Sequence, residues 1–301
     1  MKRVLVTGGA GFIGSHLSAA LLAAGYEVRV LDNLEFGQAD WVPREAEFVR
    51  GDIRDLAACR EAAREVDGIF HCAAMSRAGP SLENIDLCTQ ANIVGTQNIL
   101  VAARDAGVRK LVYSGSSTCY GNHAPPHNEA NTPVEFLNFY SLTKYTGEQY
   151  CHQFTKHFDL PCVVLRYFNV YGPRQPEQGA YALVLGIFLR RWLTGQPLEI
   201  HGDGLQRRDF VHVSDVVRAN IAAYETDCGI GPYNVGSGTN ISVQELADLV
   251  SKDQFHTQRR KGDAEATLAD ISRITSDMGW RPAVSFEDGL RGLQDAMRAN
   301  R

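Results

Sequence analysis

A tyrosine and a lysine stand four residues apart in the segment Tyr140-Ser-Leu-Thr-Lys144. On a helix this spacing places both side chains on one face. A nearby ammonium group favours phenolate over phenol, so such a tyrosine can act as a general base near neutral pH. A solvated helix face carries the same spacing by chance. The pair therefore predicts proton transfer only if other reactive groups converge on it.

A run of hydroxyl side chains, at 114 and 116–118, directly follows the apolar segment 110–113. Open α/β sheets bind ligands at the carboxyl ends of their strands, which is where these hydroxyls would lie. A hydroxyl such as that of Ser116 could donate a hydrogen bond to a substrate oxygen. A serine-rich turn without a ligand is the alternative interpretation of this segment.

A glycine-rich turn, Thr7–Gly14, follows the apolar run 4–6 and precedes a helical pattern. The glycines at 8, 11 and 14 allow a tight turn and a close approach of the backbone to a pyrophosphate. The helix N-terminus that follows offers unpaired N–H groups to the phosphates. A second apolar run, 27–31, ends at Asp32, where this arrangement needs an acid for the adenosine ribose hydroxyls. The sequence thus predicts a dinucleotide site.

Strands and helices are predicted to alternate through the first half of the chain. We expect strands at 4–6, 27–31, 48–49, 68–71, 110–113 and 162–166, separated by helices at 12–24, 55–65, 84–106 and 139–158. This alternation favours a Rossmann-type, doubly wound parallel sheet of the α/β class. Beyond Arg166 the elements are shorter, with helices expected at 183–194, 213–226, 241–252 and 286–299 and an extended segment at 198–201.

Two units are predicted from this change of pattern. Residues 1–166 form an NAD-binding Rossmann unit, to which 205–228 return. Residues 167–204 and 229–301 form a smaller, partly interleaved α/β unit that binds the substrate.

The composition is that of an ordinary soluble globular protein, with 301 residues, 44% hydrophobic and 22% charged. The net charge is −5 without long charged runs, so we expect neither a nucleic-acid partner nor a membrane surface. No apolar stretch is long enough to span a bilayer, and no signal-peptide core follows Lys2-Arg3. Seven scattered cysteines without a Cys-x-x-Cys pair predict reduced thiols, a cytoplasmic location and no metal site.

Together these features resemble the extended short-chain dehydrogenase/reductase family, in particular its nucleotide-sugar epimerases and dehydratases. The resemblance covers nearly the whole chain. Besides the segments already described, it is carried by Asp32-Asn33, Gly51–Asp55, His71–Ala74, Asn92 with Gly95-Thr96, Leu165–Arg174, His201–Gly204, Arg208–Asp215 and Arg260–Asp263.

The resemblance implies NAD as cofactor and a nucleotide diphosphate sugar, most often a UDP-sugar, as substrate. The implied catalytic residues are Ser116, Tyr140 and Lys144. The implied cofactor residues are Gly8, Gly11, Phe12, Ile13 and Gly14 at the pyrophosphate, Asp32 and Asn33 at the ribose, Asp52 and Ile53 at the adenine, Ala73 and Ala74 along the channel, and Tyr140 with Lys144 at the nicotinamide ribose. The implied substrate residues are Ser116, Asn169, Arg208, Arg260, Asp263 and Thr267, with His201 as a weaker candidate near the base. An arginine is suited to this role because it can hold a phosphate through two donors.

Departures from the family pattern narrow the expected reaction. Members that eliminate water carry an Asp-Glu pair directly after the hydroxyl residue, and decarboxylases carry a Glu at the second of these positions. Here the two positions are Ser117 and Thr118, which cannot exchange a proton as a carboxyl would. Phe139 and Gly186 stand where the family usually has proline, and the segment before Arg260 is short, so the base pocket could differ.

The sequence therefore predicts epimerisation at carbon 4 of a UDP-hexose, UDP-N-acetylhexosamine or UDP-uronic acid through a transient 4-keto sugar. An NAD(P)H-dependent 4-keto-sugar reductase is one alternative, and a non-catalytic dinucleotide-sensing or RNA-binding protein of the same fold is another. A homodimer is also expected. Family members pair the helices that correspond to 84–106 and 139–158, and apolar residues lie on more than one face of these helices, at Ile93, Ile99, Leu100, Phe154 and Phe158.

Overall fold

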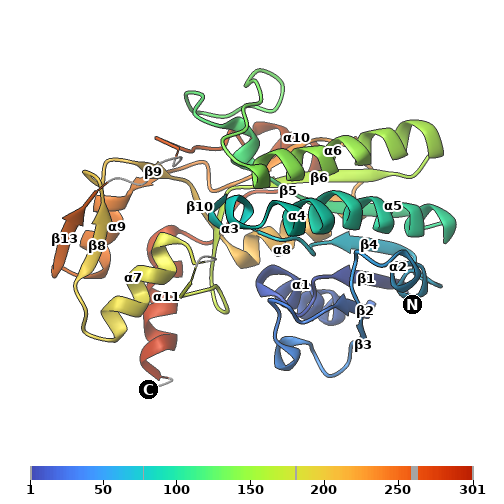
Figure 1. Cartoon of the computed structure of the whole chain (residues 1–301), viewed down its shortest axis with the longest axis horizontal. Coiled ribbons are helices and arrows are strands. Elements are labelled where there is room, and N and C mark those ends of the chain that lie inside the picture. The colour runs from blue at the N-terminus through green and yellow to red at the C-terminus, as the bar shows by residue number, and fades with distance from the viewer. Residues whose placement is uncertain (1, 77, 180–181, 259–263, 300–301) are drawn as a thin grey trace.

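The computed structural model describes residues 2–76, 78–179, 182–258 and 264–299, and its centre is a seven-stranded parallel sheet (Figure 1). In space the strands run in the order β11 (Tyr233–Val235), β6 (Cys162–Tyr167), β5 (Lys110–Ser116), β4 (Gly68–His71), β1 (Arg3–Thr7), β2 (Glu27–Asp32) and β3 (Glu47–Arg50). Parallel neighbours require crossover connections, which the helices between the strands supply. The predicted doubly wound fold is confirmed.

Helices cover both faces of the sheet, and each face has its own apolar core (Figure 1). Successive side chains of a strand point to opposite faces, so Val4 and Val6 of β1 enter one core while Leu5 enters the other. The first core lies under α1 (Phe12–Ala23) and α8 (Val213–Glu225). The second lies under α2 (Leu56–Ala62), α5 (Gly95–Asp105) and α6 (Phe139–Phe158).

The helix expected at 84–106 is not a single regular helix. It consists of α4 (Ile85–Thr89), the π-helical turn η2 (Gln90–Val94) and α5, and a short helix α3 (Ala78–Glu83) precedes it. The irregular turn carries Asn92, which is buried and bonds both backbone groups of Met75 at 2.8 and 2.9 Å. The Thr96 hydroxyl donates to the Asn92 carbonyl at 2.7 Å. Side-chain bonds of this kind stabilise a turn that a helical periodicity does not reveal.

A smaller unit lies beside the carboxyl edge of the sheet (Figure 1). Its core is formed by α7 (Val184–Leu193), α9 (Val243–Val250) and α11 (Phe286–Ala299) around the parallel pair β8 (Leu198–His201) and β13 (Gln254–Thr257). Two further pairs connect it to the sheet region, namely β7 (Asn169–Tyr171) with β10 (Phe210–His212) and β9 (Arg207–Arg208) with β12 (Ile241–Ser242). The remaining helical elements are α10 (Ser272–Met278), η1 (Ala39–Trp41) and η3 (Ser117–Tyr120).

The chain passes between the two regions more than once. Helix α8 returns to the sheet and packs on α1, β5 and β6. Strand β11 pairs with β6, so residues 233–235 lie in the large sheet although the predicted substrate unit includes them. Short strands such as this one are hard to predict because three residues carry too little periodicity. In the described part of the chain, no helix has the length and apolarity needed to cross a lipid bilayer.

Candidate active site

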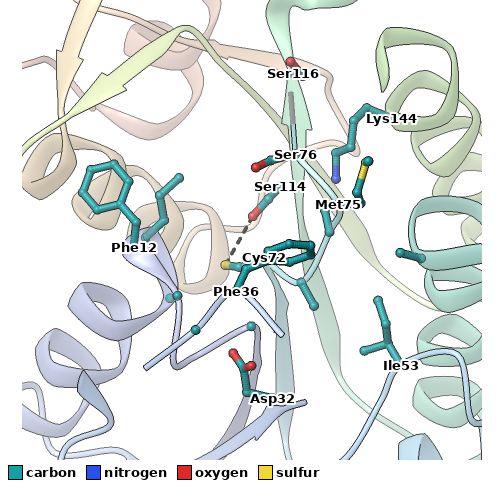
Figure 2. A pocket seen from close by; sticks show the side chains of 18 of the residues that line it. Phe12, Asp32, Phe36, Ile53, Cys72, Met75, Ser76, Ser114, Ser116 and Lys144 are labelled. Carbon is teal, nitrogen blue, oxygen red and sulfur yellow. Dashed lines mark hydrogen bonds between the residues drawn. The ribbon is translucent and has the colours of Figure 1, made fainter. Parts of the chain in front are cut away.

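A cleft of about 430 Å³ opens along the carboxyl ends of the sheet strands (Figure 2). The glycine turn forms one wall. Gly8 has φ +69°, and a Cβ there would lie 2.7 Å from the Ala73 amide nitrogen. A Cβ at Gly14 would overlap the Gly8 carbonyl, so this helix start can approach the turn only without a side chain. The turn thus leaves a backbone cradle, followed by the α1 N-terminus, that suits a diphosphate.

Asp32 lies at the end of β2, at the far end of the same cleft (Figure 2). One carboxylate oxygen accepts from the Ala10 amide at 3.0 Å and the other from the Leu34 amide at 2.8 Å. These two bonds hold the carboxylate in one orientation at the edge of the cleft. Asn33, beside it, donates to Asp52 at 2.8 Å and so links the β2 loop to the β3 loop.

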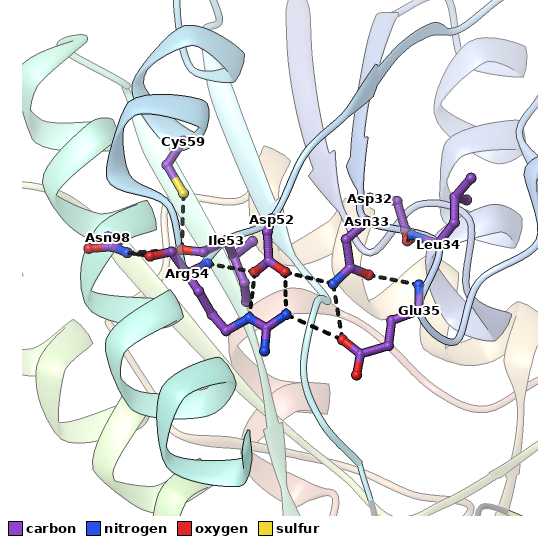
Figure 3. A network of polar contacts seen from close by, with 9 residues as sticks. All are labelled: Asp32, Asn33, Leu34, Glu35, Asp52, Ile53, Arg54, Cys59 and Asn98. Atoms are coloured by element: carbon purple, nitrogen blue, oxygen red, sulfur yellow. Dashed lines mark hydrogen bonds and ion pairs between the residues drawn. The ribbon is translucent and has the colours of Figure 1, made fainter. Parts of the chain in front are cut away.

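Asp52 accepts four hydrogen bonds, three of them from Arg54 (Figure 3). The Arg54 side chain donates through Nε at 2.9 Å and Nη2 at 2.6 Å, and its backbone amide donates at 2.8 Å. These bonds lower the pKa of Asp52 to about 2. The carboxylate is therefore ionised throughout the neutral range, and the loop after β3 is held in one conformation.

Ser116, Tyr140 and Lys144 also line the cleft. Figure 2 shows Ser116 and Lys144 at the end opposite Asp32. Ser116 ends β5, and its hydroxyl shares a hydrogen bond of 2.9 Å with that of Thr118. Tyr140 and Lys144 lie one turn apart on α6. Lys144 is 4% exposed, its Nζ lies 4.3 Å from the centre of the Tyr113 ring, and burial lowers its pKa to about 8. A hydroxyl, a phenol and a buried amine thus face one cavity.

Several contacts fix the start of α6, where Tyr140 lies in the first turn. Asn138 and Ser141 form a reciprocal capping box, and the Ser81 hydroxyl of α3 accepts from the Tyr140 amide at 3.1 Å. First-turn amides lack intrahelical partners, so these side chains determine where the helix begins. Further along, Glu148 and Arg166 form a buried bidentate ion pair at 2.7 and 3.0 Å that ties α6 to β6.

Fifteen of the predicted site residues line this one cleft. They are Gly8, Gly11, Phe12, Ile13, Gly14, Asp32, Asn33, Asp52, Ile53, Ala73, Ala74, Ser116, Tyr140, Lys144 and Asn169. His71, which the sequence favoured as structural, is buried between the hydroxyls of Thr7 and Thr96 at 2.7 and 3.0 Å. Burial lowers the pKa of His71 to about 3, so its ring is neutral.

Among the described residues, three further predicted site residues, Thr267, Arg208 and His201, do not line the cleft. Thr267 lies directly beyond it, and its hydroxyl accepts from Asn169 at 3.2 Å. Arg208 lies on β9 and donates to the Arg207 carbonyl at 2.9 Å. His201 ends β8 and bonds the Thr257 hydroxyl at 2.9 Å. Arg260 and Asp263 lie outside the described residues.

Asp209 has a role that the sequence interpretation missed. It is fully buried, and its carboxylate accepts from the amides of Ser237, Gly238 and Ala269 at 2.6 to 3.2 Å and from the Ser237 hydroxyl at 2.8 Å. Burial is the main influence on the pKa of Asp209 and raises it. The residue therefore organises two distant loops beside Thr267. An acid directly after Arg208 suggests a surface ion pair, and nothing in the sequence shows the amides that it meets.

Other cleft residues were also missed, among them Glu35, Phe36, Arg54, Met75 and Ser76. All five follow the ends of strands β2, β3 and β4. Their position after strand ends could have predicted that they line the cleft, since ligands bind at the carboxyl edge of such a sheet. Their side chains have no common chemistry, so no motif singled them out.

The fold and this cleft define a dinucleotide-dependent enzyme of the Rossmann class. The backbone cradle, the ribose-facing acid and the adenine-side loop fit NAD, and three groups able to hold or move protons lie where its nicotinamide would end. Comparison with known proteins identifies the family. Residues 4–236 match the NAD dependent epimerase/dehydratase family, and the chain belongs to it. The predicted family resemblance and cofactor are thereby confirmed.

Individual relatives match over almost the whole length. UDP-glucose 4-epimerase of Mycolicibacterium smegmatis is 36% identical over 302 residues, which cover 96% of each chain. The structure of UDP-glucose 4-epimerase of Thermotoga maritima with UDP-glucose has a TM-score of 0.94 at 34% identity and covers 99% of each chain. The structure of Thermus thermophilus UDP-glucose 4-epimerase with NAD has a TM-score of 0.92 at 36% identity, covering 99% of this chain and all of the other.

Proposed function

We propose that this protein interconverts the two carbon-4 epimers of a UDP-sugar. The observation that carries the proposal is the convergence of Ser116, Tyr140 and Lys144 on the cleft that also holds the glycine turn and Asp32. Full-length similarity to UDP-glucose 4-epimerases supports the same reaction. The reaction leaves no net redox change, because the hydrogen removed from carbon 4 is returned to it.

Tyr140 takes the proton of the sugar 4-hydroxyl, with the Lys144 ammonium favouring its phenolate form. NAD held by the glycine turn, Asp32 and Lys144 would supply reversible hydride acceptance at carbon 4. Ser116 donates a hydrogen bond to the oxygen as it becomes a ketone, which stabilises the charge that develops there. The 4-keto sugar then turns in the cleft and presents its other face, and Tyr140 returns the proton.

Elimination and decarboxylation are disfavoured by the residues beside Ser116. Thr118 is exposed in the cleft, and its hydroxyl is bonded to that of Ser116. Neither Thr118 nor Ser117 carries a carboxyl that could take or give a proton at carbon 5 or carbon 6. Chemistry confined to Tyr140 and Ser116 is what an epimerase needs.

The substrate is proposed to extend from the Ser116 end of the cleft toward Asn169 and Thr267. Arg208, Arg260 and Asp263 would hold the nucleotide diphosphate, and His201 would lie near the base. Thr267 is small, which leaves room for N-acetylhexosamines and uronic acids as well as for glucose and galactose. Its hydroxyl bonds Asn169 at 3.2 Å and the Asp209 amide at 3.2 Å, so Thr267 also supports the wall of this region.

The decisive experiment measures turnover of UDP-glucose, UDP-N-acetylglucosamine and UDP-glucuronic acid and the dinucleotide released on denaturation. We expect 4-epimer products, NAD in the released fraction, and a roughly 100-fold or greater loss of turnover in Tyr140→Phe, the usual size of a general-base contribution. The variant should retain NAD. An enzyme that purifies empty, prefers NADPH and reduces a 4-keto sugar would be the reductase instead. Absence of turnover on any nucleotide sugar would favour a non-catalytic role.

We also propose a homodimer, although not through all the residues first considered. Ile99, Leu100 and Phe154 pack inside the chain's own core and cannot form a second interface. Exposed apolar side chains instead lie on α3, α4 and α6, at Leu82, Ile85, Phe139, Leu142 and Phe158. A two-fold contact would cover them. Sedimentation at micromolar concentration should give a dimer, and Leu142→Glu should give a monomer.

The cytoplasm is the proposed location. All seven cysteines are unpaired thiols, which is the usual state in a reducing compartment. Fractionation of expressing cells tests this placement directly.

A further inference from the structure

An arginine, Arg54, lies at the adenosine end of the cleft, next to Asp52 and Ile53, which the family resemblance places at the adenine. Arg54 lines the cleft together with Asp32, although it lies 22 positions further along the chain. In Rossmann folds, an arginine near the acid at the end of the second strand is the usual acceptor for the 2′-phosphate of NADP. Arg54 is thus placed where it would favour NADP, in a family that depends on NAD.

The contacts of Arg54 resolve this conflict (Figure 3). Its Nε and Nη2 bond the two oxygens of Asp52 in a bidentate ion pair, and Nη2 also lies 3.4 Å from Glu35 Oε2. Asn33 donates to Glu35 at 3.2 Å and accepts from the Glu35 amide at 2.9 Å, so the Glu35 carboxylate is held toward the arginine. The Arg54 guanidinium is therefore paired with two carboxylates of the protein itself, those of Asp52 and Glu35.

The charges at this end of the cleft are unbalanced. Asp32, Glu35 and Asp52 supply three carboxylates, while Arg54 and Lys144 are the cations among the described residues that line the cleft. Lys144 lies at the opposite end, so the local formal charge is about −2 at neutral pH. A 2′-phosphate would add about −1.5 to −2. It would meet repulsion from three acids and an arginine whose charge is already compensated.

We propose that Glu35 is a second determinant of cofactor choice, which acts by holding Arg54 in ion pairs and thereby denying NADP its phosphate acceptor. Asp32 would repel the 2′-phosphate directly. Glu35 would keep Arg54 in an ion pair, so that Arg54 could not bind the phosphate. The inference rests on the NAD dependence of the proposed function and concerns binding alone. Either epimerase or reductase chemistry would leave the test unchanged.

The test compares the ratio of bound NADP to bound NAD. Each variant is incubated with an equimolar mixture of the two dinucleotides until the bound ratio is constant, then washed, denatured and assayed by chromatography. We expect Asp32→Ala to raise the NADP:NAD ratio at least tenfold and Glu35→Gln to raise it about three- to tenfold. Glu61→Gln is the matched control, since Glu61 does not line the cleft and forms an exposed ion pair with Arg64, and its ratio should not change.

A mutant cycle with Arg54 tests whether Glu35 acts through Arg54 or only through its own negative charge. In the native background Arg54→Gln should change the ratio less than twofold, because the arginine is not available to a phosphate. In the Asp32→Ala/Glu35→Gln background, Arg54→Gln should reverse most of the gain in NADP binding. Equal effects of Arg54→Gln in both backgrounds, or no response to Glu35→Gln, would overturn the proposal. A native protein that binds NADP preferentially would overturn the NAD assignment itself.

Discussion

Two helix-interior glycines should respond in opposite directions to the same substitution. Gly147 lies on α6, one turn after Lys144, and a Cβ there would overlap the Tyr113 hydroxyl and lie 2.8 Å from its Cζ. Gly292 lies in the interior of α11, and a Cβ there would have no neighbour within 4 Å. Alanine is the better helix former at both positions, so only the surroundings differ.

The expected magnitudes follow from three contributions. Replacing glycine by alanine in a helix interior stabilises by about 1 kcal/mol. At Gly147, overpacking against a fully buried tyrosine costs about 1–3 kcal/mol. Displacing Tyr113 also breaks its 3.1 Å hydrogen bond to the Lys144 carbonyl, which costs about 1 kcal/mol more. We therefore expect Gly147→Ala to destabilise by about 1–3 kcal/mol and Gly292→Ala to stabilise by up to about 1 kcal/mol.

The assay is thermal unfolding with saturating NAD, combined with turnover. Gly147→Ala should lower Tm by about 2–6 °C and Gly292→Ala should raise it by about 1–3 °C. Turnover should fall about tenfold or more only in Gly147→Ala, because the Tyr113 ring supports Lys144. Adding Tyr113→Phe to Gly147→Ala removes the overlapping hydroxyl and should restore part of the stability. The reasoning fails if Gly147→Ala raises Tm as Gly292→Ala does.

Three further predictions concern Lys144, the Arg166–Glu148 ion pair and Thr267. Because burial lowers the pKa of Lys144 to about 8, the unfolded chain keeps the Lys144 proton between about pH 8 and 10.5 where the native chain loses it, so the contribution of Lys144 to native stability should rise with pH there. Lys144→Met removes this contribution, so the difference in unfolding free energy between the native protein and the variant, measured with urea, should shift in favour of the native protein as pH rises through this window. Arg166→Met should cost about 3–5 kcal/mol by leaving the Glu148 carboxylate unpaired in the core, whereas Arg166→Met/Glu148→Leu should cost less; equal losses would show that the charge is irrelevant. Thr267→Tyr should reduce turnover of the N-acetylated sugar far more than that of the plain hexose, with Thr267→Ser as the control that keeps the hydroxyl bonded to Asn169. Equal loss on both sugars would refute the steric argument.

The sequence by itself determined the local conformation of the chain. The turn at Gly8, Gly11 and Gly14 needs backbone angles and close contacts that glycine permits, so its position follows from the residues themselves. The four-residue spacing of Tyr140 and Lys144 places both on one helix face wherever that helix lies. The alternation of apolar runs with helical patterns predicted the parallel sheet, because each pattern reports which faces of an element are buried.

Contacts between distant parts of the chain were decided by the tertiary structure alone. Glu35 meets Arg54 and Asn169 meets Thr267 because strand order brings their loops to one edge, and no local pattern encodes that order. Ile99 looked available for a partner, yet the second core covers it, since helix periodicity shows that a face is apolar but not what packs on it. Side-chain chemistry and spacing thus predicted Ser116, Tyr140 and Lys144, which the structure places in the lining of one cleft. The charge balance at the adenosine end depends on long-range packing, so it could be obtained only from the folded chain.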